Sequence, residues 1–220
     1  MEHTPPSHGS MRRRLMHWLS GMSLLPLAGG LLAQAPGRSV TPLRTTPEDD
    51  LGPFYPPDWG GDIDADLTRL NTATTRAEGQ HLQLGGVVRD TNGHPVADAA
   101  VEIWQADSGG RYRHPGVDPR TRDAGFQGYG RTMTDADGRY IFLTIMPGKY
   151  GSRPPHIHFR VAQPGRAEFV TQMYFRGNNR EGNGFAPPER EALTVDLVPE
   201  DQSRPGGTLS ARFDLVLAAR

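Results

Sequence analysis

Two histidines, His156 and His158, stand one residue apart in an apolar segment of the sequence. In a β-strand, residues i and i+2 project from the same face, so both imidazoles can reach one point. Ile157 then faces the opposite way, into packing. Imidazole nitrogen is a common protein ligand for metals. The pair therefore indicates half of a metal site, and two polar histidines on an exposed sheet face are the alternative.

Two tyrosines can complete such a site. Tyr150 precedes His156 by six residues, just after a Pro-Gly pair that ends a strand, and can fold back over the same face. Tyr112 lies in a glycine- and arginine-rich loop. Phenolate oxygen is a hard anionic ligand that suits ferric iron, whereas zinc usually takes histidine, cysteine or carboxylate. The alternative is that both tyrosines are ordinary aromatic residues of a β-sandwich.

The composition excludes several other classes of protein. The chain has 220 residues, with 27 glycines, 20 prolines, no cysteine and a formal net charge of -1. So much glycine and proline disfavours a helical bundle and favours short strands joined by turns. The near-neutral charge disfavours nucleic acid or an anionic membrane surface as a partner. The lack of cysteine excludes disulfides and thiolate-bound metals.

Residues 1–35 are predicted to be an export signal. A basic region at 12–14 precedes an apolar region at 15–32, and 33–35 have the small-x-small form of a cleavage site. The consecutive arginines suggest the twin-arginine route and therefore a periplasmic or extracellular location. The alternative is a membrane anchor or a cytoplasmic apolar tail, although the segment is short and interrupted by glycine and proline.

The rest of the chain is predicted to be all-β. Residues 36–80 lack periodicity, but the aromatic residues Phe54, Tyr55 and Trp59 predict an ordered, extended arm laid on the body. Residues 81–220 are predicted to form an antiparallel β-sandwich with long loops, because short apolar segments alternate with turn signals. The expected strands are 81–90, 96–107, 139–145, 155–161, 169–175 and 207–217, with an Asn-Gly hairpin turn at 91–94 and long loops at 109–131 and 176–192.

Short motifs follow one another in a fixed order along residues 51–214. They are LGPFYP (51–56), AVEIWQA (100–106), GRYRH (110–114), TDADG (134–138), PGKY (147–150), RPPHIHF (153–159), TQMYF (171–175) and RFD (212–214). Each motif alone is a weak signal. As an ordered set they resemble the intradiol ring-cleavage dioxygenases, most closely the protocatechuate 3,4-dioxygenase branch.

The resemblance implies a non-haem Fe(III) centre. Its four protein ligands are the residues that match the motifs of the family, namely Tyr112, Tyr150, His156 and His158. It also implies that Tyr150 takes up a proton from a catechol-type substrate, and that O2 opens the ring to a cis,cis-muconate-type diacid. Arg153 matches the residue that stabilises negative charge on the substrate, and Gln172 matches a residue near that guanidinium.

The substrate and the assembly are less well defined. Only Gly151 and Ser152 separate Tyr150 from Arg153, where better-known members of the family have a longer segment that lines the pocket. A protocatechuate 3,4-dioxygenase-like activity is the expectation. A substrate carboxylate could bind loop arginines, which are Arg111, Arg113, Arg122 and Arg131, or these could be solvated loop charges. A homo-oligomer is expected, and the chain could also pair with a related second chain.

Two other functions compete with this interpretation. A non-catalytic binding module of the transthyretin or carboxypeptidase-regulatory type shares the turn-and-strand pattern at 86–96 and 135–142. Such a module has no need to keep two tyrosines, an arginine and two histidines together. An exported enzyme of the same fold with a different metal is the third possibility, and metal content separates it from an iron enzyme.

Overall fold

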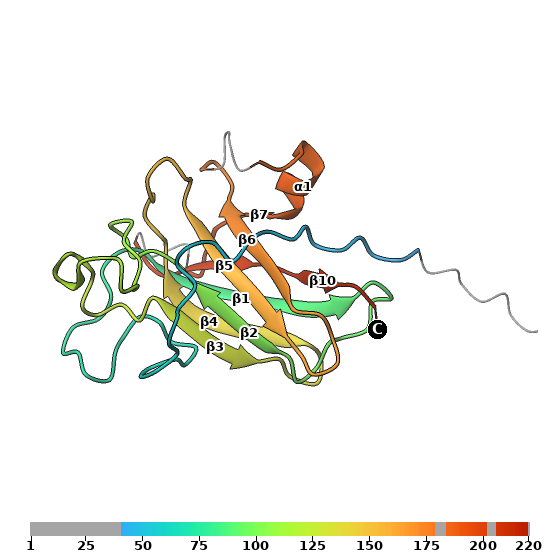
Figure 1. Ribbon diagram of the computed structural model, residues 1–220. Helices are drawn as coiled ribbons and strands as arrows, with labels where there is room; N and C mark the ends of the chain where they lie inside the picture. Colours follow the sequence, from blue (N-terminus) through green and yellow to red (C-terminus); the bar gives the residue numbers. More distant parts are fainter. Residues whose placement is uncertain (1–40, 179–183, 202–205, 220) are drawn as a thin grey trace, which may run out of the picture. The chain divides into compact units, whose positions relative to one another are not determined.

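The computed structural model describes residues 41–178, 184–201 and 206–219. Within these residues two β-sheets pack face to face (Figure 1). One sheet contains β1 (His81–Asp90), β4 (Arg139–Ile145), β8 (Val198–Pro199), β9 (Leu209–Arg212) and β10 (Leu215–Leu217). The other contains β2 (Ala100–Trp104), β3 (Tyr129–Met133), β5 (His156–Ala162), β6 (Phe169–Phe175) and β7 (Thr194–Val195). The predicted all-β sandwich is confirmed.

Helix is confined to short segments of the described chain. These are α1 (Pro187–Ala192) and a 3-10 turn at Pro119–Thr121, which lie within the two long loops expected from the sequence. In the part of the chain that the structure describes, no helix has the length and apolar character needed to cross a membrane. The predicted export signal at 1–35 lies outside the described residues.

Strand pairing is mixed rather than wholly antiparallel. The pairs β1–β4, β2–β3, β2–β5, β5–β6 and β8–β9 are antiparallel. The pairs β1–β9, β1–β10 and β6–β7 are parallel. Parallel pairing needs a long connection between the two strands, and a long stretch of chain separates the two strands of each parallel pair.

Two expected strands differ from the structure, the first because the chain turns again before it and the second because its pairing with β1 is interrupted. The Asn-Gly turn forms, with the Asp90 carboxylate accepting from the backbone N–H of Asn92 and His94 at 2.9 and 3.0 Å. The chain then turns again at Asp98, whose φ is 53°, so β2 begins at Ala100 rather than at 96. The segment 207–217 divides into β9 and β10 around Phe213, whose backbone N–H donates to Gly85 O at 2.9 Å.

Apolar residues of both sheets fill the space between them. In β2 and β5 the odd-numbered residues face this core, which leaves the even-numbered residues on the outer face of the second sheet. The largest fully buried core side chains include Leu82, Leu84, Ile103, Phe142, Ile157 and Phe159. The outer face of the second sheet is therefore free to carry a polar site.

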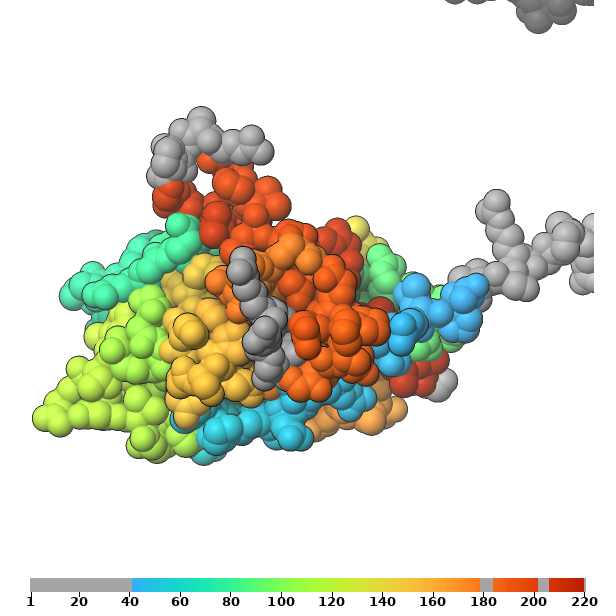
Figure 2. All heavy atoms as spheres, turned by 90° about the horizontal axis from the view of Figure 1, so that it is seen from above, coloured from blue at the N-terminus to red at the C-terminus, as the bar shows by residue number. Residues whose placement is uncertain are grey.

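An ordered segment before β1 covers that outer face. Asp49 donates its backbone N–H to Val170 O at 2.9 Å, and the Thr171 hydroxyl donates to Pro47 O at 2.6 Å. Farther along, Phe54, Tyr55 and Trp59 pack on an aromatic cluster of the sheet. Figure 2 shows the first described part of this segment, in blue and cyan, along the orange and yellow surface of the later strands.

Candidate metal centre

The histidine pair lies on β5, in the middle of the second sheet. Strand alternation places both rings on the outer face, 4.8 Å apart between centroids, while Ile157 is fully buried in the core. Each histidine is only 4 % exposed, so the alternative of two solvated histidines is wrong. The register aligns His158 with Trp104 of β2 on one side and Gln172 of β6 on the other.

The hydrogen bonds of His156 leave one ring nitrogen available to a ligand. Its Nδ1 lies 2.7 Å from the carbonyl oxygen of Pro154, which can only accept, so Nδ1 carries the proton. Its Nε2 therefore has a free electron pair, and it lies 3.1 Å from the hydroxyl of Tyr112. A ring nitrogen able to bind a metal and a phenol oxygen are thus already neighbours.

His158 also has unmet bonding capacity. Its ring stacks on Trp104, with centroids 4.7 Å apart and planes inclined by 10°. Its Nδ1 is buried and has no hydrogen-bond partner among the described residues. Buried polar atoms are nearly always paired, so an orphaned ring nitrogen in this cluster points to a missing ligand.

Backbone packing brings the two tyrosines together. Asp107 accepts from the backbone N–H of Gly109 and Arg111, each at 2.9 Å, and so fixes the loop that leads to Tyr112. Gly110 has a φ of 80°, and a Cβ there would overlap the carbonyl oxygen of Lys149. Only glycine allows the loop to approach the end of the other segment this closely.

Both tyrosine rings lie beside the imidazoles. Tyr112 is 5.6 Å from Tyr150 and 6.1 Å from His158 between ring centroids. A tight turn follows Tyr150, since Arg153 donates its backbone N–H to Tyr150 O at 2.9 Å. Tyr112 is 3 % exposed and Tyr150 is 38 % exposed, so the two phenols differ in their access to water.

Burial sets the protonation states of these groups. It lowers the pKa of His156 to about 4 and the pKa of His158 well below its usual range, and the Arg153 charge acts in the same direction. Burial raises the pKa of the Tyr112 phenol, which outweighs the opposing effect of Arg153. At neutral pH both imidazoles are therefore neutral, as ligands must be, and the Tyr112 phenol keeps its proton until a cation displaces it.

The arginine beside the cluster is held from β6. Arg153 Nη2 donates to Gln172 Oε1 at 2.6 Å and to the Tyr174 hydroxyl at 2.9 Å. Its Nε is buried and lacks a partner among the described residues. The guanidinium thus keeps an unused donor, as a group that awaits an anionic ligand would.

Three side chains around the site were not predicted from the sequence to belong to it. Phe54 stacks on Tyr112, with centroids 4.4 Å apart and planes at 9°, and meets Tyr150 edge-on at 4.9 Å. Trp104 supports His158, and Tyr174 supports Arg153. The period-2 alternation of a strand would have identified Tyr174, since it shares a face with Gln172.

The loop arginines expected for a substrate carboxylate form other contacts. Arg131 pairs with Glu102 at 2.6 Å, and Arg111 pairs with Asp107 at 3.4 Å. Arg111, Arg113 and Arg122 also line a separate small pocket that includes Asp107 and Asp123. The hydrogen-bond and ion-pair partners of Arg111, Arg113 and Arg131 lie outside the cluster of imidazoles and phenols. Arg153, in contrast, acts electrostatically on Tyr112 and His156 within that cluster.

The donor set fits ferric iron better than most other metals. Among the residues with described positions, histidine, cysteine, aspartate and glutamate do not gather in a group of three or more. The candidate ligands are therefore two neutral imidazoles and two phenols. Once deprotonated, the two phenols would supply two negative charges, which would balance much of the charge of a 3+ ion. The orphaned nitrogen of His158 and the ligand-ready Nε2 of His156 support this assignment.

Comparison with known proteins agrees with this chemistry. A family model described as Dioxygenase matches residues 51–219. The protocatechuate 3,4-dioxygenase beta chain of Burkholderia cepacia is 36% identical over 202 residues, which are 85% of this chain and 85% of that one. Catechol 1,2-dioxygenase 1 of Acinetobacter lwoffii is 31% identical over 181 residues, which cover 74% of this chain and 55% of the relative.

A solved structure shares the fold. The dioxygenase domain of a dioxygenase and carbohydrate-binding fusion protein from Streptomyces sp. SirexAA-E has a TM-score of 0.62 and 31% identity, and the match covers 80% of this chain and 100% of that one. These similarities favour an enzyme over a non-catalytic sandwich module and confirm the resemblance seen in the motifs. The chain belongs to the intradiol ring-cleavage dioxygenase family.

Proposed function

We propose that this enzyme uses Fe(III) to cleave a catechol-type ring between its two hydroxyl-bearing carbons. The observation that carries the proposal is the convergence of two phenols and two imidazoles beside a guanidinium on one sheet face. The ligands are Tyr112, Tyr150, His156 and His158. Membership in the family supports the reaction, and the donor set supports the metal.

When bound, a ferric ion supplies Lewis acidity and a redox partner for the reaction of the ring with O2, which gives a cis,cis-muconate-type diacid. The protein supplies a place for the substrate protons. Of the two phenols, Tyr150 is the one that can accept a proton and pass it to solvent, because it is 38 % exposed whereas Tyr112 is 3 % exposed. Tyr112 stays under Phe54 as the fixed ligand.

Arg153 orients and stabilises the anionic form of the substrate. Gln172 and Tyr174 hold one of its terminal nitrogens, which fixes the plane of the guanidinium. Its remaining donors are then available to substrate oxygens, and a charge fixed in advance stabilises developing negative charge without reorganisation.

We further propose that a carboxylated catechol of the protocatechuate type is the preferred substrate. The 36% identity to a protocatechuate 3,4-dioxygenase chain supports this choice. Steady-state rates with protocatechuate, catechol and hydroxyquinol, with product identification, test the preference. Turnover of uncarboxylated rings alone would contradict it.

The metal is tested by analysis and a visible spectrum of the purified protein, before and after anaerobic addition of catechol. We expect iron, a visible band from phenolate-to-iron charge transfer, and a move of that band to longer wavelength with catechol. A protein that stays colourless after ferric reconstitution would remove the iron proposal. A different metal that supports turnover would favour the same fold with other chemistry.

We propose that the chain is exported by the twin-arginine route and assembles as an oligomer. The motif at 12–14 supports export. The relative from Burkholderia cepacia is a beta chain, which supports either a homo-oligomer or a pairing with a related second chain. Cell fractionation tests export, and finding the protein in the cytoplasm would contradict it. The mass of the purified protein in solution tests assembly, and a monomer without a partner chain would contradict it.

A further inference from the structure

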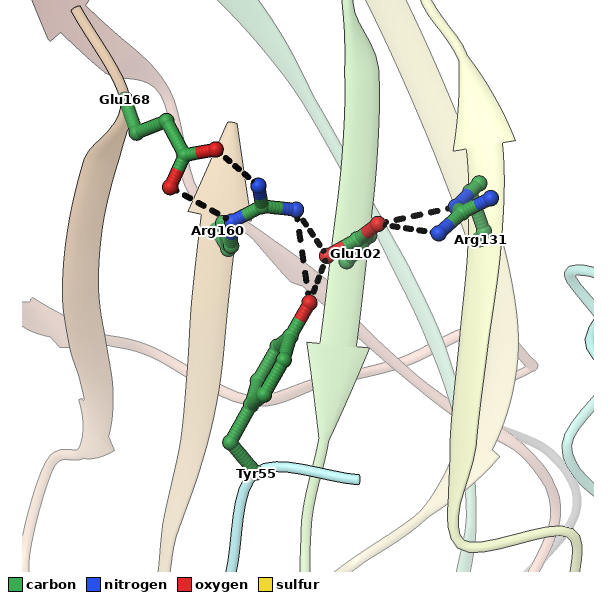
Figure 3. Close-up of polar contacts among 5 residues, drawn as sticks. All are labelled: Tyr55, Glu102, Arg131, Arg160 and Glu168. Carbon is green, nitrogen blue, oxygen red and sulfur yellow. Dashed lines mark hydrogen bonds and ion pairs between the residues drawn. The ribbon is translucent and has the colours of Figure 1, made fainter. Parts of the chain in front are cut away.

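A buried carboxylate lies on the outer face of the second sheet, away from the candidate ligands. Glu102 of β2 is 1 % exposed and is aligned with Arg131 of β3 and Arg160 of β5 (Figure 3). Arg131 donates to Glu102 Oε1 from Nε at 2.9 Å and from Nη2 at 2.6 Å. Arg160 Nη1 donates to Glu102 Oε2 at 2.7 Å. Glu168 holds the solvent side of Arg160.

The arm before β1 supplies one more donor to this carboxylate. The Tyr55 hydroxyl donates to Glu102 Oε2 at 2.9 Å, and Arg160 Nη1 lies 3.3 Å from the same hydroxyl. Figure 3 shows the Tyr55 side chain reaching up from the arm to the strand residues. Both oxygens of Glu102 are thereby satisfied, so loss of the carboxylate would leave two guanidiniums partly unpaired.

Tyr55 connects this network to the candidate metal centre by two contacts. Its neighbour in the chain, Phe54, stacks on Tyr112 at 4.4 Å. Its own ring meets Trp104 edge-on at 5.0 Å, and Trp104 stacks on His158 at 4.7 Å. Phe54 thus covers Tyr112 from the arm, and Tyr55 packs against the strand residue that stacks on His158.

We propose that Glu102 is a positioning residue that anchors the arm through Tyr55, so that the neighbouring Phe54 stays stacked on Tyr112. The arm then forms a fixed wall of the substrate site. This inference rests on the proposed function for the identity of the site, whereas the anchoring itself is a property of the metal-free chain.

The test uses Tyr55→Phe, which removes one hydroxyl and keeps the ring against Trp104. Native-state chymotrypsin cleavage after Phe54, followed by mass spectrometry on metal-free protein, measures how often the arm opens. Loss of a hydrogen bond to a charged group is expected to speed this cleavage roughly tenfold to a hundredfold. In iron-loaded protein, KM for catechol is expected to rise by about tenfold while kcat changes by less than about threefold.

Glu102→Gln is a second variant, and Glu168→Gln is its matched control. Both remove a carboxylate from Arg160, but Glu168 is on the solvent side and does not contact Tyr55. Glu102→Gln should speed cleavage after Phe54, and Glu168→Gln should leave it unchanged. Should Glu102→Gln fail to fold, Tyr55→Phe still decides, since it leaves both ion pairs of Glu102 in place.

Cleavage in Tyr55→Phe within about twofold of the parent would overturn the proposal. So would an increase no larger than the change in the global unfolding equilibrium measured in urea, because that would be general destabilisation. Since cleavage is measured without metal, a protein that binds no iron but shows the expected cleavage would leave the anchor intact and remove the iron proposal alone.

Discussion

Replacing Tyr112 by phenylalanine is expected to lower the affinity for ferric iron by roughly a hundredfold or more, because one anionic ligand is lost. The ring of the variant still fits under Phe54, so the fold should persist. Iron content after reconstitution, competition with a chelator and the intensity of the visible band provide the measurement. Turnover should fall in proportion to the iron retained.

The same residue gives the metal affinity a pH dependence of known sign. Burial raises the pKa of Tyr112, so ferric binding at neutral pH must release the phenol proton, and the apparent affinity should increase as the pH rises. The pKa of His156 is lowered to about 4, so above about pH 5 its imidazole is neutral and metal binding displaces no proton from it. In Tyr112→Phe the pH dependence should become shallower.

Tyr140→Phe is the matched control for Tyr112→Phe. Tyr140 is also a buried tyrosine, at 4 % exposure, but it lies on β4 of the first sheet, where its hydroxyl donates to the carbonyl oxygen of Phe213 between β9 and β10. Loss of this hydroxyl should reduce stability without changing iron affinity. Equal iron affinity in Tyr112→Phe and Tyr140→Phe would show that Tyr112 is not a ligand.

Arg153→Ala is the second substitution from which we expect a large effect, in this case on kcat. Removing a fixed cation that stabilises developing negative charge should lower kcat by roughly a hundredfold to a thousandfold. Iron content should be retained, since Arg153 holds no metal and contacts Gln172 and Tyr174 instead. Steady-state kinetics together with iron analysis of the same preparation separate a catalytic defect from loss of metal.

Two further variants make the Arg153 result specific. Arg153→Lys keeps the charge but not the planar fork, so it should recover only part of the lost rate. Arg176→Ala removes a cation of the same kind from an exposed network with Glu191 and Asp196 and should leave kcat unchanged. If Arg153→Ala kept full kcat, or lost activity only through lost iron, the charge-stabilising role would be wrong.

The local part of the site could be predicted from the sequence. A strand has a period of two, so His156 and His158 had to share a face wherever that strand lay. The Pro-Gly pair before Tyr150 and the glycines before Tyr112 marked turns, because these residues favour or permit the backbone angles of turns. The order of the motifs then indicated the family, and with it the sandwich fold.

Other features depended on contacts between distant segments. Because Gly110 has no Cβ, its backbone can lie close to the carbonyl oxygen of Lys149, which brings Tyr112 near Tyr150. No local sequence pattern specifies that distance. The parallel returns of β9 and β10 to β1 likewise follow from how the sheets close, not from the alternation within each strand. The ion-pair partners of Arg111 and Arg131 also could not be predicted from the sequence and became clear only from the three-dimensional structure.

The sequence by itself determined which chemical groups are available and which of them share a strand face. The tertiary structure decided which groups meet, that Phe54 of the arm stacks on Tyr112, and that Tyr55 of the arm donates to Glu102. The physical reason is the range of the interactions. Backbone geometry acts over a few residues, whereas burial, charge pairing and aromatic stacking depend on neighbours that are distant in the chain.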